Sequence, residues 1–398
     1  MHPRNPRLDR LADFPFRRLA RLLAGLAPPA EVVPIDLSIG EPQHAPPPLL
    51  AETLAAHAHL WNRYPPPQGT PEFRAACAAW LERRYRLPPG SVDPEQQVLP
   101  LAGTKEGLFL VAQLVVDAES ASRPPLVAMP DPLYAVYYGA AVVAGAEPLC
   151  LPATAASGFL PDLDALDRDQ LDRLALFYLC SPANPQGAVA DRDYLARLYR
   201  LAREHDFLVA VDECYAEIYD GLAPPGALEV VRAIDPEWRN LLVFHSLSKR
   251  SNAAGLRSGF VAGDARVMRR FLELRAYAAA VQPLPVLAAA TRLWQDEAHV
   301  EANRRLYRRK FDVAEEVLGG RLGFYRPPGG FFLWLGVGDG EAFARRAWRD
   351  AGVKLLPGGY LSPGVGKHAP GAGHVRAALV HGEEVVREAL GRLAALAT

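Results

Sequence analysis

The sequence predicts an α/β protein with a mainly parallel sheet between two layers of helices, followed by a smaller α+β region. Through the middle of the chain, short continuous apolar runs alternate with longer helical stretches. After Pro285 this alternation gives way to one long helical pattern and further short elements. The chain has 398 residues and is 50% hydrophobic, so it can bury a large core.

Seven strands are predicted, because seven apolar runs rich in β-forming residues are bounded by turn residues. Most of these runs show no alternation of apolar and polar residues, which is typical of strands buried on both faces of a parallel sheet. The predicted strands are 97–101, 126–129, 147–151, 174–180, 207–211, 241–244 and 259–262. Helices are predicted at 105–116, 132–144, 191–205, 265–275 and, as one long stretch, about 287–318.

We expect three parts: an N-terminal arm with a short helix at 1–45, a large domain at 46–285 and a small C-terminal domain at 286–398. The Arg-rich first thirty residues have a composition that a transit peptide shares. Their leucines also suit a helix that packs on the body of the protein, and we favour that interpretation. The Pro-rich segments 27–34 and 42–48 are interpreted as a linker.

Composition favours a small-molecule partner. The 44 basic and 45 acidic residues give a net charge of -1, which offers no footprint for nucleic acid or an anionic membrane. No apolar run approaches the ~20 residues that span a bilayer, and the start lacks a secretory signal. The four cysteines are widely spaced without C-x-x-C, which argues against a metal or redox motif and fits a reducing compartment. We therefore expect a cytoplasmic protein without a metal.

Polar side chains follow three successive predicted strands. Ligands of parallel α/β sheets collect beyond the carboxyl ends of the strands, so these side chains are candidates for one site. They supply an amide, a carboxylate with a phenol, and hydroxyls with an amine. In chain order they are Asn184, then Asp212 and Tyr215, then Ser246, Ser248 and Lys249.

This set meets the needs of pyridoxal 5'-phosphate. Its aldehyde requires a lysine, and Lys249 is one of only five lysines beside 39 arginines. Its ring nitrogen requires an anion, for which Asp212 is suited, and its phenolate oxygen requires donors such as Asn184 and Tyr215. We expect Lys249, Asp212 and Tyr215 to be the catalytic residues, with Lys249 holding the cofactor as a Schiff base.

The cofactor phosphate is expected at two neighbouring groups of residues. Ser246 and Ser248 offer hydroxyls, and Arg257 offers a guanidinium that suits a doubly charged group. A second set closes a strand and opens a helix, where free N–H groups face an anion. It consists of Gly103, Thr104 and Lys105. The sequence lacks G-x-x-x-x-G-K-[ST], so a nucleotide site is not indicated.

The segment from Ser246 to Gly259, S-L-S-K-R-S-N-A-A-G-L-R-S-G, resembles the S-[LF]-S-K...G-x-R-x-G signature of the class I/II aminotransferases, which have pyridoxal phosphate fold type I. Further motifs occur in the family's order. They are Ser38-Ile-Gly40-Glu-Pro, the stretch from Tyr64 to Arg74, Asn184-Pro-Gln-Gly187, Asp212-Glu-Cys-Tyr215, Pro328-Gly-Gly-Phe331, Pro357-Gly-Gly and Val375-Arg376. The chain departs from the family at Gln186, where Thr is usual.

The resemblance implies further roles. Tyr134 would stack on the cofactor ring. Arg376 would bind the substrate α-carboxylate, with Asn184 and the Gly40 backbone beside it. Tyr64 would reach the phosphate of a neighbouring subunit, so a homodimer is implied.

Within the family, the segments around Lys249 and the opening of the chain most resemble N-succinyldiaminopimelate aminotransferases, although Ala254 replaces their usual Pro. The implied reaction converts N-succinyl-LL-2,6-diaminopimelate and 2-oxoglutarate into N-succinyl-2-amino-6-oxopimelate and glutamate, in lysine biosynthesis. Open alternatives are an aspartate, LL-diaminopimelate or aromatic aminotransferase, a carbon-sulfur lyase or a decarboxylase. A regulator that binds the cofactor is disfavoured, because Gly40 leaves little room before it for a DNA-binding module.

Structural interpretations compete with these roles. Asp212 could cap a helix, Asn184 could be a turn residue and Tyr134 could fill the core. Arg376 could form a surface salt bridge, and the Lys105 side chain could be solvated while its N–H meets the phosphate. For His245, the alternation of side chains along a strand predicts packing away from the cofactor.

Overall fold

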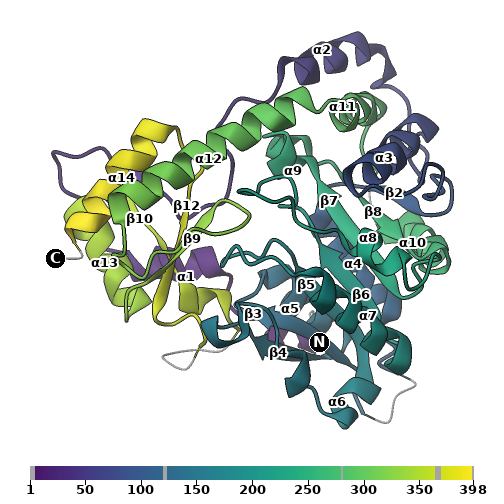
Figure 1. The fold of residues 1–398 in the computed structure, drawn as a ribbon, viewed down its shortest axis with the longest axis horizontal. Helices are drawn as coiled ribbons and strands as arrows, with labels where there is room; N and C mark the ends of the chain where they lie inside the picture. Colours follow the sequence, from purple (N-terminus) through teal and green to yellow (C-terminus); the bar gives the residue numbers. More distant parts are fainter. Residues whose placement is uncertain (1–4, 120–122, 279–280, 364–368, 397–398) are drawn as a thin grey trace.

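A computed structural model describes residues 5–119, 123–278, 281–363 and 369–396. At its centre is a seven-stranded sheet of order β2-β8-β7-β6-β5-β3-β4 (Figure 1). Only β8 runs antiparallel to its two neighbours in this sheet, so the predicted α/β class with a mainly parallel sheet is confirmed. The strands are β2 (Val98–Leu101), β3 (Leu126–Asp131), β4 (Glu147–Pro152), β5 (Leu174–Cys180), β6 (Leu208–Asp212), β7 (Leu241–Ser246) and β8 (Gly259–Gly263).

All seven predicted strands are present, with ends that differ by at most two residues. Six of them are buried almost throughout, as continuous apolar runs require. The exception is β4, which lies at the edge of the sheet and is only partly covered.

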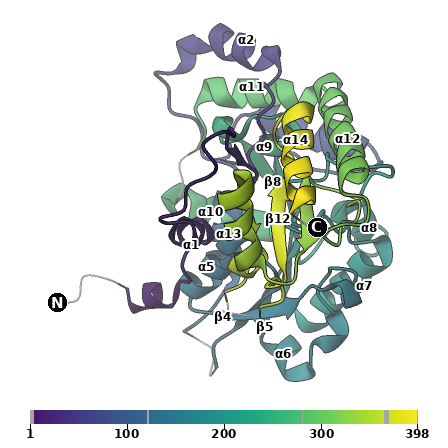
Figure 2. The same cartoon turned by 90° about the vertical axis from the view of Figure 1, so that its left-hand side faces the viewer.

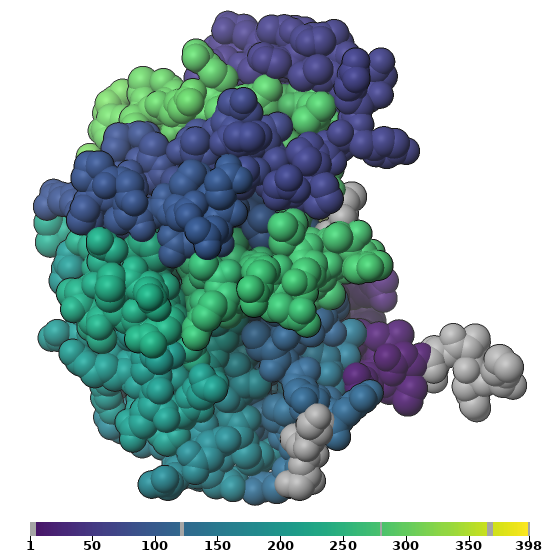
Figure 3. Space-filling view, turned by 90° about the vertical axis from the view of Figure 1, so that its right-hand side faces the viewer, coloured from purple at the N-terminus to yellow at the C-terminus, as the bar shows by residue number. Residues whose placement is uncertain are grey.

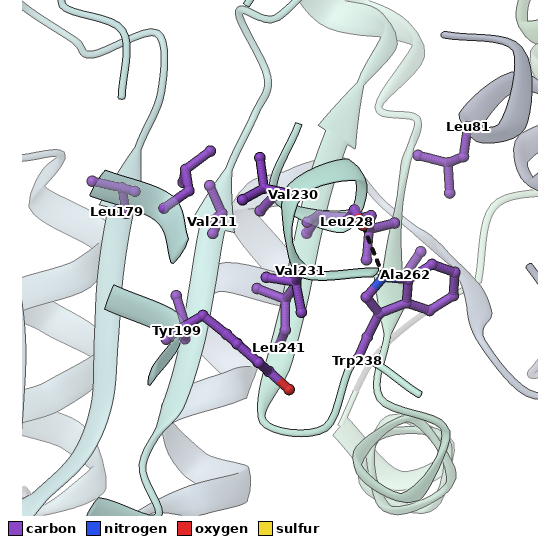
Figure 4. Close-up of a cluster of buried hydrophobic side chains, with 14 of the residues drawn as sticks. Leu81, Leu179, Tyr199, Val211, Leu228, Val230, Val231, Trp238, Leu241 and Ala262 are labelled. Carbon is purple, nitrogen blue, oxygen red and sulfur yellow. Dashed lines mark hydrogen bonds between the residues drawn. The ribbon is translucent and has the colours of Figure 1, made fainter. Parts of the chain in front are cut away.

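Helices cover both faces of the sheet. On one face lie α4 (Thr104–Val115), α5 (Ala135–Ala144) and α10 (Ala265–Ala278), and on the other lie α7 (Arg192–His205) and α8 (Ala227–Arg232). Successive residues of β5 alternate between these two cores. Figure 4 shows the second core, in which Trp238 Nε1 donates a hydrogen bond to the Leu228 carbonyl at 2.9 Å.

A helical group lies beside the β2 edge. It consists of α2 (Pro48–Ala56), α3 (Pro71–Arg84) and α11 (Leu284–Gln295), which pack on one another. Figure 3 shows this side of the molecule, with α2 and α3 in dark blue above α10 in green. The short helices α6 (Arg168–Arg173) and α9 (Leu247–Arg250) follow β4 and β7 in the chain.

The second part of the fold has its own core around a small antiparallel sheet of order β11-β12-β9 (Figure 2). Its strands are β9 (Phe332–Gly336), β11 (Leu356–Pro357) and β12 (His374–Ala378), and β1 (Ile35–Asp36) pairs with β10 (Val353–Lys354) beside it. Its helices are α12 (Ala298–Leu318), α13 (Gly340–Ala351) and α14 (Glu383–Ala395).

The N-terminal arm packs on the body, as its leucines predict. Leu19 of α1 (Pro15–Leu22) and the following Leu23 are buried against Trp334 and Leu356. The arm begins with the 3-10 helix η1 (Pro6–Arg10), and other 3-10 turns are η2 (Ala58–Leu60), η3 (Ala155–Ser157), η4 (Leu163–Ala165), η5 (Ala254–Leu256) and η6 (Gly358–Leu361). The division at residues 45 and 285 stays a prediction.

The prediction of a single helix over 287–318 is wrong, because α11 and α12 are separated at Asp296 and Glu297. Asp296 is extended, with φ of -99° and ψ of 124°. The Arg250 guanidinium holds the break, since it donates to the Leu293 carbonyl at 2.6 Å, the Asp296 carbonyl at 3.2 Å and the Glu297 carboxylate at 2.7 Å. These contacts come from a residue far away in sequence, so no local pattern indicates them. Among the described helices, none is long and apolar enough to cross a membrane.

Candidate functional site

A cavity of about 290 Å³ lies at the carboxyl ends of β5, β6 and β7, where the two parts of the fold face each other. One wall carries the last residues of these strands. The opposite wall carries side chains of β9, β11 and β12, and the N-terminal arm contributes Phe14, Pro15 and Phe16. Strand ends of a parallel sheet and a junction between two cores are both places where small molecules bind.

All but two of the predicted site residues line this cavity. They are Gly40, Thr104, Lys105, Tyr134, Asn184, Asp212, Tyr215, Ser246, Ser248, Lys249, Arg257 and Arg376. Gly103 lies directly behind the wall, where a Cβ would collide with the Arg257 guanidinium. Tyr64 is 100% exposed and lies outside the cavity of its own chain, so its predicted place at a neighbouring subunit stays a prediction.

Lys249 presents its amine at the centre of the site. It lies on α9, whose first turn is capped by the Ser246 hydroxyl accepting from the Ser248 N–H at 3.1 Å. The Lys249 Nζ donates to the Gly40 carbonyl at 2.5 Å. Burial, together with the charge of Arg376, lowers the pKa of Lys249 to about 8. A substantial neutral fraction is therefore present near neutral pH, as a nucleophile or a general base requires.

Asp212 ends β6 as a carboxylate that is only 4% exposed. It accepts a hydrogen bond from the Tyr137 hydroxyl at 2.8 Å and another from the Cys214 N–H at 3.2 Å. Within the described residues it forms no ion pair, and burial raises its pKa. A buried carboxylate whose hydrogen-bond donors are all neutral is stabilised by a cation inside the cavity. A protonated pyridine ring is such a cation. The donor set therefore fits pyridoxal 5'-phosphate.

Arg376 on β12 is buried across the cavity from the large sheet. It donates to the Asn184 side-chain oxygen at 3.0 Å and to the Ser38 carbonyl at 2.7 Å, and it lies 4.3 Å from the centroid of the Phe332 ring. Burial lowers its pKa to about 10, so it remains a cation at neutral pH. In the described part of the chain no carboxylate pairs with it, and a fixed guanidinium of this kind suits a carboxylate brought by a ligand.

The start of α4 offers groups that suit an anion. Gly103 caps this helix with φ of 80°, and Thr104 begins it, so the first N–H groups have no partners within the helix. Arg257 is held beside them, because its guanidinium donates to the Ala254 carbonyl at 2.9 Å and the Ala102 carbonyl at 3.4 Å. The hydroxyls of Ser246 and Ser248 line the same cavity.

Two tyrosines complete the walls. Tyr134 caps α5 and meets Tyr137 edge to face, with ring centroids 5.6 Å apart. Tyr215 packs edge to face on Phe331 and Phe332, at 5.4 and 5.7 Å between centroids. Both tyrosines have a raised pKa because they are buried, so their hydroxyls keep their protons and can donate.

Sequence reasoning missed several residues of the cavity wall. Tyr137 lies three positions after Tyr134, and that helical spacing is a signal for a shared face. Cys180 ends β5 and Cys214 adjoins Tyr215, but their residue type indicates no role here. Phe14 and its neighbours carry no local signal, because only the folding of the arm brings them to the cavity. The described residues contain no cluster of His, Cys, Asp and Glu that would hold a metal ion.

Comparison with known proteins agrees with this geometry. The family model "Aminotransferase class I and II" matches residues 32–393. The LL-diaminopimelate aminotransferase of Desulforudis audaxviator is 33% identical over 398 residues, which cover 97% of this chain and 98% of that protein.

Solved structures show the same fold. An aminotransferase of Neisseria meningitidis is 38% identical, with a TM-score of 0.94 over 99% of this chain and 100% of that one. A probable N-succinyldiaminopimelate aminotransferase of Thermus thermophilus is 28% identical, with a TM-score of 0.83 over 96% and 99% of the two chains.

Proposed function

Since this chain belongs to the class I and II aminotransferases, which depend on pyridoxal 5'-phosphate, we propose that it exchanges an amino group between N-succinyl-LL-2,6-diaminopimelate and 2-oxoglutarate. One observation carries the proposal. The amine of Lys249, with its lowered pKa, shares a small cavity with a buried carboxylate and a buried guanidinium that lack ionic partners among the described residues.

Lys249 has two tasks in this proposal. Its Nζ would hold the cofactor covalently until the substrate amine displaces it, and the freed Nζ would then take the proton from the substrate Cα and return it on the cofactor side. When bound, pyridoxal 5'-phosphate supplies an aldehyde that carries the amino group and a ring that takes up the electron pair left at Cα. The Gly40 carbonyl, which accepts from Nζ at 2.5 Å, marks a position for the free amine.

The other residues hold the reactants. Asp212 keeps the proton on the ring nitrogen, and Asn184 and Tyr215 donate to the ring oxygen. Tyr134 covers the ring, and Arg376 orients the substrate through its α-carboxylate. The phosphate is assigned to the α4 N-terminus with its neighbouring side chains, which are Gly103, Thr104, Lys105, Ser246, Ser248 and Arg257.

The choice of substrate rests on similarity and on space. The relatives act, by their names, on LL-diaminopimelate or its N-succinyl derivative. A second cavity of about 390 Å³ adjoins the first and shares with it the walls formed by Phe14, Lys105, Leu133 and Leu361. This space supports a substrate whose chain continues well beyond the reacting carbon. LL-diaminopimelate itself is the second candidate, favoured by the 33% identical relative.

A panel of substrates tests the proposal. The purified protein loaded with cofactor is mixed with N-succinyl-LL-2,6-diaminopimelate, LL-diaminopimelate, aspartate or phenylalanine, and each half-reaction is followed by the cofactor absorbance. We expect the succinylated substrate to give the highest kcat/KM, with 2-oxoglutarate as acceptor and ping-pong kinetics. Faster turnover of aspartate or phenylalanine contradicts the substrate assignment. Release of pyruvate and ammonia from a sulfur amino acid would instead indicate a lyase.

A further inference from the structure

A buried acid-base pair lies behind the catalytic ends of β6 and β7. His245 Nε2 is 3.1 Å from Glu213 Oε2, and the two side chains are 2% and 3% exposed. Neither residue lines the cavity. Glu213 directly follows Asp212, and His245 directly precedes Ser246, so the alternation of side chains turns this pair to the opposite side of the same strand ends. His245 therefore faces away from the cavity, as the alternation along the strand predicts.

The pair joins four elements. The Glu213 carboxylate accepts from the Tyr85 hydroxyl, next to α3, at 2.6 Å and from the N–H of Ala227, on α8, at 2.8 Å. The Glu213 N–H donates to the Phe244 carbonyl of β7 at 2.9 Å. The pair therefore fixes the spacing between the ends of β6 and β7, which carry Asp212 and the turn that leads to Lys249.

The imidazole itself is enclosed by aromatic rings. The His245 ring centroid lies 4.9 Å from that of Trp80, 5.2 Å from that of Phe260 and 5.9 Å from that of Tyr85. A charge in such surroundings is costly, and apolar side chains of similar volume often replace a buried ion pair without loss of stability. Stability alone therefore gives no reason for this pair.

Burial and hydrogen bonds set the pKa values of the two neighbouring carboxyl groups, Glu213 and Asp212. Burial would raise the pKa of Glu213, but His245 and the hydrogen-bond donors around the carboxylate bring it below its ordinary value, so the carboxylate is ionised. Burial raises the pKa of Asp212, while hydrogen bonds from Tyr137 and Cys214 oppose this effect.

Other ionisable side chains lie near Glu213 and His245, namely Tyr85, Arg84 and Arg250. Tyr85 keeps its proton, because burial and the Glu213 charge raise its pKa. Arg84 pairs with Glu217 on the outer side of Tyr85. Arg250 lies beyond Trp80 and pairs with Glu297. Each of these two arginines has its own carboxylate partner, which leaves His245 as the partner of Glu213.

We propose that Glu213 and His245 are positioning residues for the cofactor ring: their contact at 3.1 Å, with the hydrogen bonds from Tyr85 and Ala227 to Glu213, supports the ends of β6 and β7 from behind and so holds Asp212 opposite the ring nitrogen. This inference rests on the proposed cofactor site. It differs from a purely structural role in one respect, because displacement of Asp212 weakens only a ligand that pairs with this carboxylate through its ring nitrogen.

Positioning of Asp212 and a purely structural role predict different changes in the binding of two ligands. Binding of pyridoxal 5'-phosphate to the cofactor-free protein is compared with binding of its analogue in which carbon replaces the ring nitrogen, both followed by absorbance. For Glu213→Gln and His245→Gln we expect the affinity for pyridoxal 5'-phosphate to fall about tenfold or more, since a displaced Asp212 loses its charge-assisted hydrogen bond to the ring nitrogen. The affinity for the analogue should change less than about threefold.

Matched variants act as controls. Tyr199→Phe removes a buried phenol that donates to the Asp235 carboxylate at 3.0 Å in the same core, away from the cavity, and it should leave both affinities unchanged. Tyr85→Phe keeps the Glu213 and His245 side chains and removes one hydrogen bond to Glu213, so it gives a milder, intermediate loss of the same selectivity. If Glu213→Gln or His245→Gln fails to fold, Tyr85→Phe still tests the proposal.

Equal losses for both ligands, or no loss for either, would overturn the inference. These results are distinguishable from a failure of the cofactor site itself. If the cofactor site is wrong, the unmodified protein binds neither ligand with a spectral change. If only the role of Glu213 and His245 is wrong, the unmodified protein binds both ligands and the variants show no selective loss.

Discussion

Arg376 illustrates how the surroundings of a single residue give it a task. The chain carries 39 arginines, and many of them form ion pairs at the surface, as Arg387 does with Glu316. Arg376 is instead buried, holds Asn184 and the Ser38 carbonyl, and has no carboxylate partner among the described residues. Its place on β12 makes it the counterpart of Lys249 across the cavity.

The first prediction concerns this guanidinium. Arg376→Lys keeps the charge but loses the two-pronged geometry, so kcat/KM for the amino donor should fall about 10- to 100-fold. The absorbance of the bound cofactor should be unchanged, because Arg376 is assigned to substrate. Steady-state kinetics measure the effect, and Arg387→Lys is the control that should match the unmodified protein. An unchanged kcat/KM for Arg376→Lys would remove this residue from the substrate site.

Among the elements, the start of α4 is the place to which we assign the cofactor phosphate, because its first backbone N–H groups have no partners within the helix. Gly103 has φ of 80°, and a side chain there would press on the Arg257 guanidinium. Both requirements explain why glycine stands at this position.

Gly103→Ala should therefore weaken cofactor binding by at least about tenfold, because it combines left-handed strain with displacement of Arg257. Gly90→Ala is the matched control, since Gly90 has φ of 75° and open space where a Cβ would lie. Both variants carry the strain of a positive φ, but only the first should lose affinity in a cofactor titration. Equal affinities for the two variants would argue against a phosphate at this helix end.

The elements also show what sequence can and cannot supply. The strands were predictable because burial on both faces leaves continuous apolar runs, and residues at their carboxyl ends, such as Asp212 and Lys249, could be assigned from position and chemistry together. The break between α11 and α12 was not, since Arg250 creates it by a distant contact. Phe14 reaches the cavity only through the packing of the N-terminal arm, and no motif marks it.

For the whole molecule, one buried amine outside the site links folding to pH. Lys310 on α12 is 1% exposed, and its Nζ donates to the Leu379 carbonyl at 2.8 Å, just after the strand that carries Arg376. Burial, with the charge of Arg309, lowers its pKa to about 7.

Between about pH 7 and the ordinary lysine value near 10.4, the unfolded chain therefore binds more protons at Lys310 than the folded one does. The free energy of unfolding should rise with pH across this window, by up to about 1.4 kcal/mol per unit from this group. Lys310→Met should flatten the slope, as measured by urea unfolding at pH 7, 8 and 9. The same slope in both proteins would contradict the assignment.

Assembly is a further prediction at this scale. We propose a homodimer in which Tyr64, fully exposed in one chain, contributes to the phosphate site of the other. Sedimentation should give about twice the chain mass of 43.3 kDa. Tyr64→Phe should weaken cofactor binding a few-fold without changing the mass. A monomer that binds the cofactor with full affinity would refute this role.

The proposed function depends on a covalent bond between Lys249 and the cofactor. The most direct measurement is borohydride reduction of the protein loaded with pyridoxal 5'-phosphate, followed by peptide mapping. We predict one stable pyridoxyl group per chain, on Lys249, and none on Lys249→Arg treated in the same way. A pyridoxyl group found mainly on another lysine, such as Lys310 with its similarly lowered pKa, or no adduct at all, would contradict the assignment.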